Sequence, residues 1–150
     1  MGYEFPVADP CPACEWLAGR EPWAPVFQTE LATSYVASRQ RTHGTVCVIP
    51  RRHVRCLSEF TSAELTEVSQ ILRDVITGIE RAYAPDSLHT WISTGSLAAQ
   101  HRPHAHINVV PRRADDPYTF EASFGLARVP VEDRARIAAE ITAGLRSASA

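Results

Sequence analysis

The sequence contains no lysine, since all 15 of its basic residues are arginine. This absence excludes Schiff-base chemistry and catalysis by a lysine side chain. The chain also lacks an apolar run approaching the ~20 residues that a membrane-spanning helix needs. Its N-terminus lacks the basic and apolar segments of a signal peptide. We therefore expect a soluble cytoplasmic protein that makes no use of a membrane.

Charge of one sign is not in excess either, because the formal net charge is only -2 at pH 7. Bulk electrostatics therefore give no reason to expect binding to nucleic acid. No Gly-x-Gly-x-x-Gly run follows a predicted strand, so a dinucleotide redox role finds no support. With 150 residues, 45% of them hydrophobic, the chain suits one domain with a core. We expect a single domain over residues 1–150, with a lead-in at 1–10 and an extension at 114–150.

Periodic apolar residues predict one long amphipathic helix. Thr61 and Glu64 have the spacing of a capping box, and apolar residues then repeat every three or four positions as far as Ile79. Pro85 marks its end, because the residue before a proline avoids helical geometry. A similar stripe predicts a closing helix over 131–145, after an irregular aromatic segment at 118–129.

Short apolar or alternating runs predict strands between and around these helices, at residues 25–30, 33–38, 45–50, 88–94 and 104–111. The connections between them are short. This order of strands and helices predicts an α+β fold with an antiparallel sheet.

Cys11 and Cys14 form a Cys-x-x-Cys pair, which in a reducing compartment indicates a metal knuckle or a redox pair. A redox pair usually follows a strand in a thioredoxin-like unit, and no strand is predicted before Cys11. We therefore favour a metal. Cys47 lies in a predicted strand and is interpreted as a small buried hydrophobe, and Cys56 as a free thiol.

Histidines gather in the segment from Gln100 to Arg112, where polar and apolar residues alternate. On a strand, His104, His106 and Asn108 would share one face, and the apolar residues between them would share the other. Solvent-facing strands usually carry Thr, Lys or Glu instead. We therefore interpret this segment as a site rather than as a half-solvated edge strand.

These features together resemble the histidine triad (HIT) superfamily of nucleotide hydrolases and transferases. The family's alternation of histidine and apolar residues corresponds to residues 104–110, with Asn108 in place of the third histidine. Its Val-Ile-Pro-basic-basic-His segment corresponds to residues 48–53, and its Asn-x-Gly-x-x-Ala-Gly-Gln run to residues 93–100. The resemblance implies a HIT-like antiparallel sheet with one long helix, and protomers that pair as a homodimer.

The resemblance also implies a reaction. In the family the middle histidine, here His106, attacks the α-phosphorus of a nucleotide and forms a nucleotidyl-histidine. The implied catalytic residues are His106, Asn108 and Gln100. The implied substrate-binding residues are Ser93, Gly95, Ala99, Gln100 and His101. We expect backbone N–H groups of the 95–100 loop to hold phosphate oxygens, and a main-chain carbonyl to accept from the second ring nitrogen of His106.

A structural zinc ion requires a tetrahedron of nitrogen and sulfur ligands. In zinc-bearing members of the family, the histidine after the basic pair and the first histidine of the triad complete the set that the two cysteines begin. The resemblance therefore implies a Zn²⁺ site made of Cys11, Cys14, His53 and His104. The alternative is a pair of ordinary thiols beside two solvated histidines.

Some positions depart from the family pattern. Asn108 cannot titrate near neutral pH, although it can hydrogen-bond a phosphate oxygen, and an amide at this place leaves transferase chemistry open. Ala37 stands where family members often carry an acidic ribose ligand, with Arg39 and Arg41 nearby. These arginines suit either an acidic group or solvent. His101 is either an additional acid or anion contact, or an exposed loop residue.

The sequence therefore predicts a nucleotide hydrolase or nucleotidyltransferase. Two alternatives stay open. One is a repurposed HIT-like enzyme that acts on a non-nucleotide substrate, and the other is a non-catalytic protein that binds a nucleotide or another ligand.

Overall fold

The computed structural model of the protein describes residues 2–117, 130 and 133. Residues 2–117 belong to one unit. The aromatic segment predicted at 118–129 and the closing helix predicted at 131–145 lie outside the described residues. A single domain over the whole chain therefore stays a prediction.

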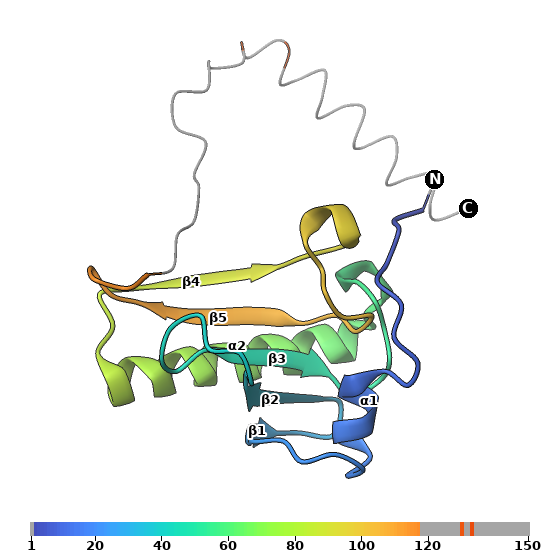
Figure 1. Cartoon of the computed structure of the whole chain (residues 1–150), viewed down its shortest axis with the longest axis horizontal. Helices are drawn as coiled ribbons and strands as arrows, with labels where there is room; N and C mark the ends of the chain where they lie inside the picture. Colours follow the sequence, from blue (N-terminus) through green and yellow to red (C-terminus); the bar gives the residue numbers. More distant parts are fainter. Residues whose placement is uncertain (1, 118–129, 131–132, 134–150) are drawn as a thin grey trace. The chain divides into compact units, whose positions relative to one another are not determined.

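A five-stranded antiparallel sheet forms the body of the described unit (Figure 1). The spatial order of its strands is β1-β2-β3-β5-β4. The strands are β1 (Pro25–Gln28), β2 (Ala32–Val36), β3 (Val46–Pro50), β4 (Ser87–Ile92) and β5 (Ile107–Arg112). The helices are α1 (Pro12–Leu17) and α2 (Ser62–Tyr83), with short 3₁₀ turns at Leu57–Glu59 and Ser96–Ala98. The predicted α+β class and antiparallel sheet are confirmed.

Strand β3 is buried on both faces of the sheet, which explains its continuous apolar run. Val46 and Val48 pack in a core with the buried side of α2. Cys47 and Ile49 point the other way and pack with Tyr35 and the α1 segment. Helix α2 therefore covers one face (Figure 1), and the opposite face carries the N-terminal cysteines and the site.

Helix α2 begins at the predicted capping box. The Thr61 hydroxyl accepts from the Glu64 N–H at 3.2 Å, and the Glu64 carboxylate accepts from the Thr61 N–H at 2.8 Å. The same carboxylate accepts two hydrogen bonds from Arg52, at 2.9 and 2.8 Å. The Arg52 guanidinium lowers the pKa of Glu64 to about 2. Glu64 thus ties the start of α2 to the segment that presents His53.

We expect Glu64→Ala to lower the free energy of unfolding by about 1–3 kcal/mol, because it removes the cap and a charge-assisted pair. Urea denaturation measures this loss, with Glu80→Ala on the exposed side of α2 as the control. The folded-state pKa is lowered, so the contribution is present above pH 4.5 and is lost as the pH falls towards about 2. Equal effects from the two substitutions would contradict the role of Glu64.

The predicted strand at 104–111 is wrong at its start, because β5 begins at Ile107. The Ala105 N–H donates to the Val54 carbonyl, outside the sheet, so residues 104–106 do not alternate as a strand would. Helix α1 was not predicted, because it is only 6 residues long and begins inside the Cys-x-x-Cys pair. Among the described residues, no helix has both the length and the apolar character needed to cross a bilayer.

Candidate active site and metal centre

A cleft of ≈ 610 Å³ opens on the sheet face opposite α2. The loop after β2, the end of β4, the loop before β5 and the start of β5 all contribute to its lining. Of the predicted site residues it brings together Ser93, Ala99, His101, His106 and Asn108. Gly95 and Gln100 lie outside its lining, in the scaffold behind it.

The tautomer of His106 is fixed by its own backbone surroundings. Its Nδ1 lies 2.9 Å from the carbonyl oxygen of His104. A carbonyl can only accept, so Nδ1 carries the proton and Nε2 keeps its lone pair. The predicted main-chain partner of this ring is therefore confirmed. Burial lowers the pKa of His106, so the imidazole is neutral at pH 7. A neutral imidazole lining a cleft is a nucleophile for phosphorus.

Asn108 is oriented by Cys47, which faces it across β3 and β5. The Cys47 thiol donates to Asn108 Oδ1 at 3.7 Å. The other end of the amide, Nδ2, donates to no group among the described residues and belongs to a side chain that lines the cleft. Asn108 therefore presents a hydrogen-bond donor to a ligand. The sequence identified Cys47 as buried, and nothing in it indicated this polar contact.

Gln100 organises the loop before β5 from inside. Its Oε1 accepts from the Gly95 N–H at 2.7 Å, and its Nε2 donates to the carbonyls of Arg55 and Arg102 at 2.8 and 2.9 Å. Gly95 has φ +85, and a Cβ there would lie 3.2 Å from the Glu4 carbonyl oxygen, so the position requires glycine. The Gln100 side chain is buried, and both ends of its amide are hydrogen-bonded to the backbone. Its role is therefore to hold the conformation of the loop.

The predicted use of the loop's backbone N–H groups as phosphate ligands stays a prediction, and most of these groups already donate within the protein. The N–H of Gly95 is held by Gln100, and the N–H groups of Ser96, Ala98, Ala99 and Gln100 donate to backbone carbonyls. The Ser96 N–H donates to the Glu4 carbonyl in the N-terminal segment, and the others donate within the loop around the 3₁₀ turn at Ser96–Ala98. The cleft's side chains are therefore the more available donors to ligand oxygens.

Arginines supply much of the charge in the cleft. Arg39, Arg41 and Arg102 line it, and no carboxylate does so among the described residues. The Arg102 guanidinium donates to the Tyr35 hydroxyl at 2.7 Å and its Cζ lies 4.9 Å from the Trp16 ring centroid. Sequence reasoning missed Arg102, because its neighbours are distant in the chain and the fold alone brings them together.

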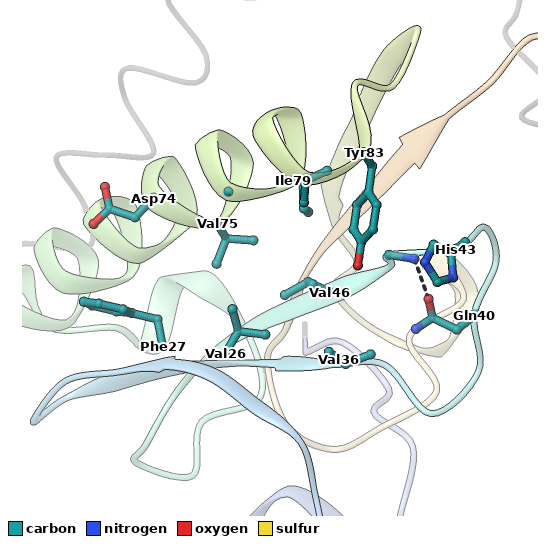
Figure 2. Close-up of a pocket in the computed structure, with 13 residues that line it drawn as sticks. Val26, Phe27, Val36, Gln40, His43, Val46, Asp74, Val75, Ile79 and Tyr83 are labelled. Atoms are coloured by element: carbon teal, nitrogen blue, oxygen red, sulfur yellow. Dashed lines mark hydrogen bonds between the residues drawn. The ribbon is translucent and has the colours of Figure 1, made fainter.

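A second hollow, of ≈ 470 Å³, lies between α2 and strands β1, β2 and β3 (Figure 2). Its lining is mostly aliphatic and aromatic, with His43 and Gln40 at one end (Figure 2). His43 does not line the polar cleft. The polar cleft, which holds His106, Asn108 and the arginines, is the candidate for chemistry.

The predicted metal ligands form a compact cluster. The ligand atoms of Cys11, Cys14, His53 and His104 all lie within 4.8 Å of one another. Cys14 Sγ lies 3.3 Å from His53 Nδ1 and 3.9 Å from His104 Nδ1, and Cys11 Sγ lies 3.8 Å from His104 Nδ1. Zinc bonds of about 2.0–2.3 Å in a tetrahedron place ligand atoms about 3.3–3.8 Å apart. These three distances lie at or close to that range, so the four residues can hold a tetrahedral Zn²⁺.

His104 has the tautomer that a metal requires. Its Nε2 lies 2.9 Å from the Pro50 carbonyl and must donate to it, which leaves the Nδ1 lone pair facing the cysteines. Burial lowers the pKa of His104 to about 4, so the ring is neutral. The carbonyl of this same residue holds His106. The metal cluster and the candidate nucleophile are thus joined through one residue.

Comparisons with known proteins agree with this geometry. The HIT domain family matches residues 19–115. The chain is 32% identical over 90 residues to the asymmetrical bis(5'-nucleosyl)-tetraphosphatase of Schizosaccharomyces pombe, covering 60% of this chain and 50% of that protein. A HIT family protein from Bacillus subtilis superposes with a TM-score of 0.82 and 26% identity, over 88% of this chain and 94% of that one. A zinc-bound histidine triad family protein from Mycobacterium smegmatis has the same fold, with a TM-score of 0.67, 24% identity and coverage of 92% and 96%.

Proposed function

The chain belongs to the histidine triad (HIT) family, and on that premise we propose that it is a nucleotide hydrolase or nucleotidyltransferase that acts at an α-phosphorus. The observation that carries the proposal is the state of the His106 side chain in the cleft. Its Nδ1 is committed to the His104 carbonyl, its ring is neutral, and it lines a polar cleft. The S. pombe relative, half of whose length the chain spans, is named as an asymmetrical bis(5'-nucleosyl)-tetraphosphatase.

The proposed reaction has two displacements at phosphorus. His106 Nε2 attacks, a P–N bond forms, and the bond from phosphorus to the leaving group breaks. His101, which lines the cleft, gives a proton to the leaving group. Water or another acceptor then attacks phosphorus and passes its proton back to His101. The P–N bond breaks, and its electron pair returns to Nε2. The Nδ1–H stays on the His104 carbonyl, which stabilises the positive ring of the intermediate.

Side chains bind the phosphoryl oxygens in this account, because most of the loop N–H groups already donate to protein oxygens. Asn108 Nδ2 and the Ser93 hydroxyl offer neutral donors, and His101 offers a third. Gln100 acts as a positioning residue, because its amide holds the loop that carries Ala99 and His101.

We expect Asn108→Asp to lower kcat/KM by about 10²-fold, because a carboxylate would replace the amide donor beside an anionic group. Asn108→Ala should cost about tenfold, because it only removes the donor. Steady-state kinetics on one substrate compare the two variants. An aspartate variant as active as the alanine variant would contradict donation by Nδ2 to the phosphoryl group.

We also propose that Cys11, Cys14, His53 and His104 hold a structural Zn²⁺. The cluster distances and the His104 tautomer support this site. The ion would stabilise the fold and tie the α1 segment to the residue whose carbonyl orients His106. No chemical step passes through it.

A homodimer and a cytoplasmic location are part of the proposal and rest on the family resemblance. Light scattering coupled to size-exclusion chromatography measures the mass of the assembly. A mass of a single chain at micromolar concentration would contradict the dimer.

The activity is tested with a panel of nucleoside phosphoramidates, adenylyl sulfate and dinucleoside polyphosphates. Liquid chromatography follows the release of nucleoside monophosphate. We expect turnover of at least one class, with the label of isotopically enriched water appearing in the monophosphate. A panel without turnover would overturn the nucleotide activity and favour a non-nucleotide substrate or a binding role.

A further inference from the structure

A row of polar side chains, Tyr35, Cys47 and Asn108, crosses three strands of the sheet. Tyr35 on β2 lies opposite Cys47 on β3, and Cys47 lies opposite Asn108 on β5. Residues opposite one another on neighbouring strands have their side chains on the same face of the sheet. All three side chains belong to buried residues. Polar groups buried in this way are normally hydrogen-bonded, so the contacts along the row decide which way each group points.

The row has a fixed start, because the Arg102 guanidinium can only donate hydrogen bonds. Its Nη1 donates to the Tyr35 hydroxyl oxygen at 2.7 Å. That oxygen is therefore an acceptor, and the proton of the hydroxyl is left to donate elsewhere. Burial raises the pKa of Tyr35, so the hydroxyl keeps this proton at neutral pH. Tyr35 can thus donate to the residue that it faces, Cys47.

Cys47 accepts from one neighbour in the row and donates to the other. Burial raises the pKa of Cys47, and a hydrogen bond from the Tyr35 hydroxyl to the sulfur partly opposes that rise. The thiol therefore keeps its proton at neutral pH, and its S–H donates to Asn108 Oδ1 at 3.7 Å. With Oδ1 held by Cys47, the Nδ2 of Asn108 is the end of the amide that is left to donate into the cleft.

The direction of these hydrogen bonds matters for a ligand of the cleft. The two ends of an asparagine amide have nearly the same shape, so the amide can turn over and present Oδ1 in place of Nδ2. An oxygen in that place would face the oxygens of a phosphoryl group as a second acceptor and would repel them. A thiol and a hydroxyl alone could exchange donor and acceptor roles, and the guanidinium of Arg102 removes that freedom.

We propose that Tyr35 and Cys47 are positioning residues for the reaction. They carry a one-way series of hydrogen bonds from Arg102 to Asn108, which holds the Asn108 amide with its donor towards the phosphoryl group. This inference rests on the proposed function and adds to it two residues that act through Asn108.

Infrared spectroscopy of the full chain tests the direction of these hydrogen bonds without any substrate. The S–H stretching band of a thiol lies clear of other protein bands and moves to lower wavenumber when the thiol donates a hydrogen bond. The band of Cys47 is identified by its loss in Cys47→Ala. We expect it to move to higher wavenumber in Asn108→Ala, which removes the acceptor, and by a smaller amount in Tyr35→Phe, which removes the donor to sulfur. Cys56→Ser is the control and should leave this band unchanged.

Steady-state kinetics test the positioning role. Tyr35→Phe keeps the aromatic ring, whose centroid lies 5.1 Å from that of Trp16, so its effect reports on the hydroxyl. We expect Cys47→Ala to lower kcat/KM by about tenfold and Tyr35→Phe by about threefold. In the Asn108→Ala background each should change kcat/KM by less than about twofold, because the group that they position is gone.

Two results would overturn the proposal. One is a Cys47 band that stays in place in Asn108→Ala, which would mean that the thiol does not donate to the amide. The other is a loss from Cys47→Ala or Tyr35→Phe that multiplies with the loss from Asn108→Ala, as a general structural defect would. A substrate panel without turnover would count against the proposed function alone, since the infrared band still decides the direction of the hydrogen bonds.

Discussion

His106→Ala is expected to lower kcat/KM by at least ~10³-fold, because it removes the nucleophile while leaving the cleft in place. The side chain is partly buried and its ring makes one hydrogen bond, to the His104 carbonyl. Its loss should therefore alter the chemistry far more than the fold. Single-turnover kinetics with the best substrate of the panel measure the effect on the first displacement directly.

The matched control is His43→Ala. His43 is exposed, packs on the Tyr83 ring with centroids 5.0 Å apart, and does not line the polar cleft. Its removal should change kcat/KM by less than about threefold. Activity in His106→Ala within tenfold of the wild type would move the nucleophile elsewhere and remove the basis of the mechanism.

Cys14→Ser is expected to abolish stoichiometric zinc binding and to lower the free energy of unfolding by at least about 3 kcal/mol. The substitution breaks a four-ligand set in which Cys14 lies within 4 Å of both histidine ligands, at 3.3 and 3.9 Å. Zinc content by elemental mass spectrometry and urea denaturation measure the two effects. The wild type should contain about one zinc per chain.

Cys56→Ser is the control for this experiment, because Cys56 is a buried free thiol outside the cluster. It should keep its zinc and lose less stability. A Cys14→Ser protein that retained full zinc content would show that the zinc is bound elsewhere. Treatment of the wild type with a chelator should reproduce the stability loss without any substitution.

Local patterns were sufficient for much of the fold. The capping box of Thr61 and Glu64 and the apolar stripe after it depend only on neighbours in the chain, and α2 occupies Ser62–Tyr83 as they indicate. The apolar run around Val48 likewise predicted the central strand β3. The metal cluster was predicted from the family resemblance and not from local patterns, because its ligands are up to 93 residues apart in the sequence.

Contacts between distant segments account for what the sequence did not reveal. The histidine segment leaves the strand pattern because the Ala105 N–H donates to Val54 instead of to a neighbouring strand. The contact of Cys47 with Asn108 requires the register of β3 and β5. The stacking of Arg102 on Trp16 requires α1 to lie against the sheet. No local propensity encodes these pairings.

The stereochemical course at phosphorus tests the central claim, a covalent intermediate on His106, most directly. A substrate with a single configuration at a phosphorothioate α-phosphorus is hydrolysed in isotopically labelled water, and the configuration of the product is determined. Each in-line displacement inverts the centre, so attack by His106 followed by attack by water predicts net retention. Net inversion would mean that water attacks directly, and it would contradict the covalent mechanism.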